Sequence, residues 1–213
     1  MVFSVALLTL APNSSAIQFN TAQLLQHMLK SFGPNGQSIL QSWFDLLAKE
    51  QQATQHKQLI AVNQFWNQAV MATSDATAWG QVDYWATPLE SLGRRAGDCE
   101  DYVIGKYFSL LRLGVSEHKL RLIYVRARIG GMYSTDSVAH MVLGYYDTPG
   151  AEPLILDNLL SDILPSGQRP DLTPVFSFNG QGIYVQGAKP TPTSRITRWR
   201  DLLSRMQQEG FQP

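Results

Sequence analysis

Apolar residues in the first third of the chain recur at the three- and four-residue spacing of amphipathic helices. One stripe covers residues 24–29, and two more cover residues 39–47 and 59–70. Between the first two stripes lies Phe-Gly-Pro-Asn-Gly at 32–36, a sequence expected to end the first helix. The pattern therefore predicts a helical N-terminal segment.

The spacing changes after residue 99. Apolar positions at 103–111 keep the helical period, and Gly114 is placed to stop that helix. The period of strands follows at 120–127, 139–146 and 154–157, and in a hairpin of 175–178 with 182–185 around Asn179-Gly180. An amphipathic helix is predicted at 194–206. A helix followed by antiparallel strands indicates an α+β fold.

The composition is that of a globular protein of one domain. The 213 residues are 44% apolar and 16% charged. Lysine plus arginine and aspartate plus glutamate number 17 each, so no excess of charge points to nucleic acid. The single cysteine excludes an intrachain disulfide and a cysteine-based zinc site.

Residues 1–16 have features of a secretory signal peptide. Residues 1–10 are apolar and Ser14-Ser15-Ala16 is typical of a cleavage site, but no basic residue precedes them, which a start codon assigned too late would explain. We therefore expect export, with 1–16 as a signal-peptide remnant and 17–213 as a single domain. Within that domain we expect a mainly helical lobe at 17–98, a helix and sheet at 99–193, and a C-terminal helix at 194–213. No apolar run reaches the roughly 18 residues of a membrane span.

The stretch Gly97-Asp98-Cys99-Glu100-Asp101 places the one cysteine at the expected start of a helix. A lone cysteine is often a buried apolar residue, but an apolar core seldom begins with so acidic a sequence. A nucleophilic thiol needs a base and a group that orients the base. Of the four histidines only His140 falls in a predicted strand, and Asp157 ends the next strand. Cys99, His140 and Asp157 are thus the candidate nucleophile, base and orienting group.

Three acidic residues, Asp98, Glu100 and Asp101, crowd this thiol. Their charge disfavours a thiolate, whereas the helix N-terminus and a protonated histidine favour it. A cation could offset them, either Arg94 and Arg95 or a Ca²⁺ ion, which takes several oxygen ligands from a short loop. The same three residues can also be explained without a metal. Asp98 would then be the N-cap of the helix, and Glu100 and Asp101 would interact favourably with the positive end of the helix dipole. Spacing alone leaves both interpretations open.

Two further features also leave alternatives. The aromatic segment 79–92 leads into the cysteine stretch, and it either walls a substrate cleft or packs in the core. The last helix, with its arginines, either docks on the domain or meets an acidic partner.

An oxyanion hole needs two donors, for which the backbone N–H of Cys99 and the Trp85 side chain are candidates.

Four motifs carry a resemblance: Tyr-Trp-Ala-Thr-Pro-Leu-Glu at 84–90, Gly-Asp-Cys-Glu-Asp-Tyr at 97–102, Ala-His-Met-Val-Leu at 139–143 and Leu-Ile-Leu-Asp-Asn at 154–158. As a set they resemble the bacterial transglutaminase-like cysteine proteinases, and among these the LapG-type periplasmic proteases. The resemblance covers roughly residues 79–184. It implies a papain-like, transglutaminase-like fold, with N-terminal helices and a cysteine-bearing helix packed on an antiparallel sheet. It also implies a Cys99, His140 and Asp157 triad, and a required Ca²⁺ beside the nucleophile at Asp98, Glu100 and Asp101.

The resemblance implies a biological role as well. Such proteases cut a very large surface adhesin near its N-terminus at a small-residue site, in the periplasm, and so release cells from a biofilm. The periplasmic domain of an inner-membrane cyclic-di-GMP receptor sequesters them. Because the same triad serves transglutaminases and amidases, acyl transfer is an alternative reaction. A non-catalytic calcium-dependent binding module and a redox-sensing thiol are the alternatives outside this chemistry.

Overall fold

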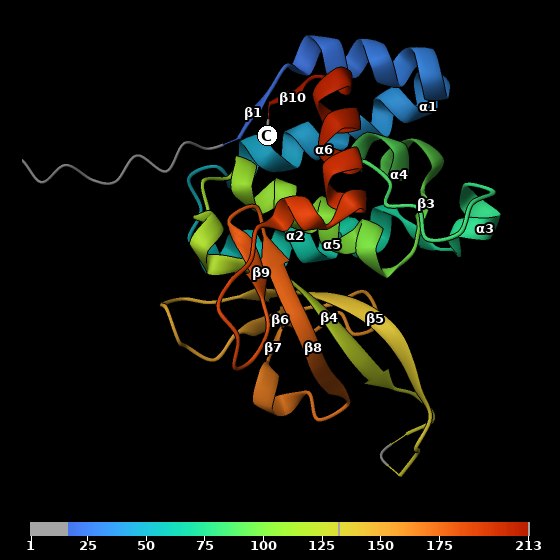
Figure 1. Cartoon of the computed structure of the whole chain (residues 1–213). Coiled ribbons are helices and arrows are strands. Elements are labelled where there is room, and N and C mark those ends of the chain that lie inside the picture. Colours follow the sequence, from blue (N-terminus) through green and yellow to red (C-terminus); the bar gives the residue numbers. More distant parts are fainter. Residues whose placement is uncertain (1–16, 132, 213) are drawn as a thin grey trace, which may run out of the picture.

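The computed structural model describes residues 17–131 and 133–212. Helices gather on one face of a sheet, so the molecule has a helical layer and a sheet layer (Figure 1). The helices are α1 (Thr21–Glu50), α2 (Gln55–Ala69), α3 (Asp75–Ala78), α4 (Pro88–Arg94), α5 (Cys99–Arg112) and α6 (Thr197–Glu209). The predicted α+β class is confirmed.

The sheet has six strands in the order β7-β6-β5-β4-β8-β9, and all neighbours are antiparallel. Their bounds are β4 (Leu120–Arg128), β5 (Ser137–Tyr145), β6 (Leu154–Leu156), β7 (Leu164–Pro165), β8 (Leu172–Asn179) and β9 (Gly182–Tyr184). β5 pairs with β4 along its whole length, but with β6 only from Leu143 to Tyr145. The part of β5 that contains His140 therefore extends past the end of β6. The predicted hairpin joins β8 to β9, with Gly180 and Gln181 as the turn between the paired residues Asn179 and Gly182.

Two short pairs of strands lie outside this sheet. β1 (Gln18–Phe19) pairs antiparallel with β10 (Phe211–Gln212), and β2 (Met71–Ala72) pairs parallel with β3 (Ala96–Gly97). The second pair ties the end of α2 to the residues just before Cys99. The first pair brings the two ends of the described chain together beside the helical layer (Figure 1).

α1 consists of two helical segments that meet at Gly33. This glycine has φ +68° and ψ −168°, outside the helical region, and Pro34 follows it. Proline suits the first position of a helix, where its missing N–H is not needed. The predicted break at 32–36 is confirmed, although the second segment begins at once and no loop separates the two.

α5 is held at the centre of the core. The hydroxyl of Ser109 accepts hydrogen bonds from the indole N–H groups of Trp43 in α1 (2.8 Å) and Trp66 in α2 (2.9 Å). One turn earlier, a Cβ at Gly105 would lie 2.5 Å from the Trp66 ring, so this position needs glycine. Because α5 is fixed by these contacts on one side and packs against the sheet on the other, the position of its N-terminus is fixed too.

The C-terminal helix α6 docks on the domain, one of the two alternatives raised by its sequence. Trp199, Leu202 and Met206 are buried along one side. Arg205 also points inward and donates hydrogen bonds to Glu90 and to the backbone carbonyl of Trp85. None of the described helices combines the length and apolarity that crossing a membrane requires. The expected signal-peptide remnant lies outside the described residues.

Candidate active site

The N-terminus of α5 is shaped by Asp101. Its carboxylate accepts hydrogen bonds from the backbone N–H groups of Ala86 (2.8 Å) and Asp98 (3.3 Å). A Cβ at position 97 would lie 2.6 Å from an oxygen of this carboxylate, which explains why Gly97 precedes the turn. Asp101 thus fixes the loop before the helix, and Cys99 occupies the first turn, where it is partly buried.

The Cys99 thiol is surrounded by unfavourable charge. Its sulfur donates a hydrogen bond to Oε2 of Glu100 at 3.0 Å. Burial, followed by the charges of Glu100 and Asp98, raises the pKa of the thiol well above its ordinary range, and a hydrogen bond from the backbone N–H of Met141 opposes this only in part. The thiol is therefore protonated at neutral pH unless a cation intervenes. The Met141 contact also sets the sulfur beside β5, next to His140.

His140 and Asp157 meet as the strand pattern predicts. Nε2 of His140 lies 2.8 Å from Oδ1 of Asp157, and the two side chains are 4% and 0% exposed. Burial opposes ionisation of Asp157, but hydrogen bonds from His140, the Leu159 N–H and Arg169 outweigh it and lower the pKa of Asp157 to about 2. Asp157 is thus a carboxylate that orients the imidazole through Nε2, which leaves Nδ1 as the nitrogen available to a neighbouring group.

Arg169 and Asp171, which no sequence motif marks, extend this pair. Nη2 of Arg169 donates to Oδ2 of Asp157 at 2.8 Å. The same guanidinium bonds the Asp171 carboxylate through Nη2 (2.7 Å) and Nε (3.0 Å). Both oxygens of Asp157 therefore accept hydrogen bonds, which fixes the carboxylate as well as its charge.

Lys106 is an unexpected charge beneath the site. It lies in α5 two turns after Cys99 and is fully buried. Its Nζ is 5.8 Å from the centroid of the Tyr102 ring and has no hydrogen-bond partner in the described part of the chain. Burial lowers the pKa of Lys106 to about 7, and the charge of Asp157 opposes the shift. The apolar spacing after Cys99 does not include position 106, so sequence reasoning missed this residue; Lys106 is buried because α5 is enclosed on nearly all sides from Asp101 to Leu110.

Cys99 and His140 line one pocket of about 410 Å³. Acidic side chains form much of its wall: Asp75, Asp83, Asp98 and Glu100. Val82, also in the wall, is 91% exposed. A second pocket, over β4, β5 and β8, shares Tyr124 and Ala139 with the first. The two form a continuous open surface of the kind that an extended polypeptide could cover.

The acidic wall has the chemistry of a calcium site. Asp75 begins α3 and Asp83 lies in the following loop, so neither is near Cys99 in sequence. Ligand atoms lie within 4.8 Å of one another in three overlapping groups: Asp75, Asp83 and Glu100; Asp98, Cys99 and Glu100; and Asp75, Asp98 and Asp101. Oδ1 of Asp75 and Oδ1 of Asp98 are buried without a hydrogen-bond partner among the described residues. Burial and the neighbouring Glu100 raise the pKa of Asp98 to about 9. Crowded carboxylates with unsatisfied oxygens fit a hard cation such as Ca²⁺.

The two arginines considered as counter-charges are engaged elsewhere. The guanidinium of Arg94 lies over the Trp79 ring, 4.9 Å from its centroid. Nε of Arg95 donates to the backbone carbonyl of Ala69 at 3.4 Å. Within residues 17–131 and 133–212, neither forms an ion pair with the acids around Cys99. Arg198 pairs with the Asp83 carboxylate at 2.6 Å, whereas Asp75, Asp98 and Glu100 have no ion pair among the described residues. The charge that offsets these three acids has to come from another source.

Trp85 lies in the core. Its ring stacks on Phe178 at 5.7 Å and meets Trp199 edge-on at 6.5 Å, and it does not line the pocket that contains Cys99. Its Nε1 is buried and has no acceptor among the residues described. At this residue the aromatic segment packs in the core, one of the two alternatives considered for it. The role of Trp85, like that of the Cys99 backbone N–H, as an oxyanion donor stays a prediction.

Comparison with known proteins identifies the family. Residues 44–170 match the family described as bacterial transglutaminase-like cysteine proteinase BTLCP. The EGTA-treated structure of Legionella pneumophila LapG is 34% identical, with a TM-score of 0.78, and the match covers 90% of this chain and 100% of that one. The calcium-bound structure of the same protein is 36% identical, with a TM-score of 0.73, and the match covers 85% and 97%. Among curated proteins there is no significant match. Since the family match spans more than half of the sequence, the chain belongs to the bacterial transglutaminase-like cysteine proteinases.

Proposed function

We propose that the chain is a calcium-dependent cysteine endopeptidase in which Cys99 is the nucleophile, His140 the general base and acid, and Asp157 the orienting group. One observation carries the proposal: the imidazole of His140, bonded to Asp157 at 2.8 Å, shares a pocket with a thiol at a helix N-terminus. Membership of a cysteine proteinase family supports the reaction class.

The proposed reaction follows from the roles of these groups. Cys99 gives its proton to Nδ1 of His140, and the thiolate attacks the scissile carbonyl carbon. The backbone N–H of Cys99, at the positive end of α5, is a donor to the resulting oxyanion. His140 protonates the leaving amine, and water then hydrolyses the thioester. Asp157 remains ionised throughout and stabilises the imidazolium.

Asp98 and Glu100, joined by Asp75 and Asp83, are the residues we propose to hold Ca²⁺. The bound ion supplies positive charge that offsets the carboxylates around the thiol. Support comes from the buried, unsatisfied oxygens of Asp75 and Asp98 and from the similarity to Legionella LapG, which has a calcium-bound structure. Asp101, expected as a third ligand, has its oxygens bonded to two backbone N–H groups, so we assign it mainly to shaping the loop.

The substrate and partners are proposed from the motif resemblance and from similarity to LapG. We propose a periplasmic location and, as the substrate, the N-terminal region of a large surface adhesin, cut at a small-residue site so that cells leave a biofilm. The periplasmic domain of an inner-membrane cyclic-di-GMP receptor is the proposed inhibitory partner. The open surface that joins the two pockets at Tyr124 supports a polypeptide substrate.

The test is incubation of the chain with the N-terminal fragment of a candidate adhesin, in calcium and in EGTA. We expect two products in calcium, none in EGTA, and none from Cys99→Ala in either. Cross-linked or amine-modified fragments in place of two products would indicate acyl transfer. Cleavage that EGTA leaves unchanged would exclude the metal requirement, and cleavage by Cys99→Ala would exclude the nucleophile.

A further inference from the structure

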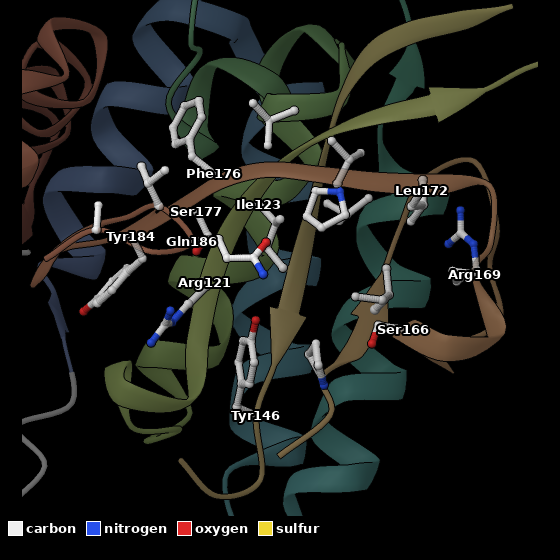
Figure 2. Close-up of a pocket in the computed structure, with 18 residues that line it drawn as sticks. Arg121, Ile123, Tyr146, Ser166, Arg169, Leu172, Phe176, Ser177, Tyr184 and Gln186 are labelled. Carbon is white, nitrogen blue, oxygen red and sulfur yellow. The ribbon is translucent and has the colours of Figure 1, made fainter. Parts of the chain in front are cut away.

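A third pocket, larger than the two already described, lies on the face of the sheet opposite α5 (Figure 2). We call it the rear pocket. Its volume of about 540 Å³ is within the range typical of small-molecule sites. Its floor is formed by Ile123, Val125, Val142 and Ile155, an apolar cluster separate from the main core. Val125 also borders the pocket over β4, β5 and β8, but none of the four residues takes part in the proposed catalytic chemistry, which does not account for this apolar floor.

The charge around the rear pocket has one sign. Its lining contains two arginines, Arg121 and Arg169, and no acidic side chain. Figure 2 shows Arg121 at one end, near Tyr146 and Tyr184, and Arg169 at the other end. The charge of Arg169 is already shared between Asp157 and Asp171. Arg121 is therefore the cation left to attract a ligand.

Arg121 is oriented without being neutralised. Its guanidinium carbon is 3.7 Å from the centroid of the Tyr184 ring and 5.3 Å from that of Tyr146. In the described ranges it forms no ion pair. A guanidinium stacked on an aromatic ring keeps its planar N–H edge for a carboxylate, which it can bind through two hydrogen bonds.

The floor and the rim together restrict the kind of ligand. A strongly polar anion such as inorganic phosphate would pair with Arg121 but leave the apolar floor uncovered. An uncharged apolar molecule would cover the floor but leave Arg121 without a counter-charge. Ser177 of β8 pairs with Ile123 and lines the pocket. Because its side chain is small, it leaves room for a ligand above the apolar floor.

We propose that the rear pocket binds an amphipathic monocarboxylate. Its carboxylate pairs with Arg121, and its apolar chain lies on the cluster of Ile123, Val125, Val142 and Ile155. This is a binding site distinct from the pocket of Cys99, and it is independent of whether the chain cleaves a protein.

The test compares sodium octanoate with 1-octanol by isothermal titration calorimetry on the full chain. The two ligands share the apolar chain and differ in the charged head. We expect saturable binding of one octanoate, at least about tenfold tighter than octanol, because a bond to a charged partner contributes this much. Absence of saturable octanoate binding, or equal affinity for both ligands, would overturn the proposal without any mutation.

Variants locate the site. Arg121→Gln should remove the preference for octanoate over octanol, whereas Arg200→Gln, at an exposed position of α6, should keep it. Ser177→Phe should fill the space above the floor and weaken the binding of both ligands at least about tenfold. Circular dichroism checks that each variant is folded. If a variant is unfolded, the comparison of octanoate with octanol on the unmodified chain still decides whether the proposal holds. A folded Ser177→Phe or Arg121→Gln variant that binds octanoate as the parent does would place the ligand elsewhere and contradict the proposal.

Discussion

Arg169 bonds Asp157 through the carboxylate oxygen that His140 does not use. Its Nη2 lies 2.8 Å from Oδ2, while Nε2 of His140 lies 2.8 Å from Oδ1. The Asp171 carboxylate holds the same guanidinium at 2.7 Å. The His–Asp pair is thus part of a hydrogen-bonded chain of four residues, of which His140, Asp157 and Arg169 are buried and Asp171 is partly exposed, and Arg169 acts on the imidazole through Asp157. We regard Arg169 as a positioning residue.

Replacing Arg169 with methionine should lower kcat about tenfold to hundredfold with little change in KM, because partners that orient an active group typically have effects of this size. Loss of the guanidinium removes a hydrogen bond and a positive charge from Asp157, so its pKa should rise from about 2. The acid limb of the pH–rate profile should therefore move to higher pH. Both quantities are read from steady-state cleavage at several pH values.

Arg169→Lys, which keeps the charge, should recover part of the lost kcat. Arg200→Met, at an exposed site of α6, is the matched control and should behave as the parent. A purely structural role would lower the unfolding midpoint without moving the pH profile. Parental kcat in a folded Arg169→Met variant would rule out the positioning role.

Glu100 should suppress the thiol when calcium is absent. It accepts the hydrogen bond of Cys99, and its charge raises the pKa of the thiol. In EGTA, Glu100→Gln should therefore speed alkylation of Cys99 by iodoacetamide about tenfold at neutral pH, as a pKa lowered by one unit would do. The readout is specific because Cys99 is the only cysteine of the chain. Glu50→Gln, far away at the end of α1, is the control, and an unchanged or slower rate in Glu100→Gln would contradict the electrostatic account.

Asp75 and Asp83 should contribute to calcium affinity. Each supplies a ligand atom to the acidic cluster, and the number of charged ligands sets affinity in oxygen-based calcium sites. Asp75→Asn and Asp83→Asn should each weaken calcium binding about tenfold or more in a calorimetric titration. Asp136→Asn, in the exposed connection between β4 and β5, is the matched control. If both variants bind calcium as tightly as the control does, the ion is not held by these residues.

Lys106 should make stability depend on pH. Its folded-state pKa of about 7 lies below the ordinary value of 10.5, so between these values the unfolded chain binds the extra proton and stability rises with pH. Below pH 7 the folded protein carries a buried ammonium group. Lys106→Met should therefore increase the free energy of unfolding at pH 6 by about 1–3 kcal/mol and flatten its rise between pH 7 and pH 10.

Urea unfolding at pH 6 and pH 9 measures both effects of this substitution. Lys49→Met, at a site whose side chain is 80% exposed, should leave the pH dependence unchanged. A loss of stability at pH 6 in Lys106→Met would mean that the ammonium is favourably paired with Asp157, contrary to this account.

The positions of the catalytic candidates could be predicted because each lies in or directly beside a regular element: Cys99 begins α5, His140 lies in β5, and Asp157 follows the last residue of β6. The start of α5 follows from the sequence around Cys99, and the strand periods place His140 in one strand and Asp157 at the end of the neighbouring one. In such elements the backbone geometry decides where a side chain points, so spacing is informative.

The remaining parts of the site depend on tertiary packing. Asp83 and Arg169 reach the site from irregular segments, and Asp75 from a four-residue helix, so no periodic pattern precedes them. The loop that contains Asp83 is held by α6, whose Arg198 pairs with the Asp83 carboxylate at 2.6 Å, although the two lie far apart in sequence. A contact of this kind has no local signature. The hydrogen bond that the Asp101 carboxylate accepts from the backbone N–H of the distant Ala86 is a second contact without a local signature, and the role of Asp101 as a metal ligand stays a prediction.

The central claim is that the acids around Cys99 keep the thiol protonated and that bound calcium, with His140, makes it a nucleophile. The most direct measurement is the rate at which iodoacetamide alkylates Cys99 at pH 7, in calcium and in EGTA, for the parent and for His140→Ala. The account predicts fast alkylation of the parent in calcium, a rate at least about tenfold lower in EGTA, and slow alkylation of His140→Ala in both. Equal rates for the parent with and without calcium, or a parental rate in His140→Ala, would contradict it.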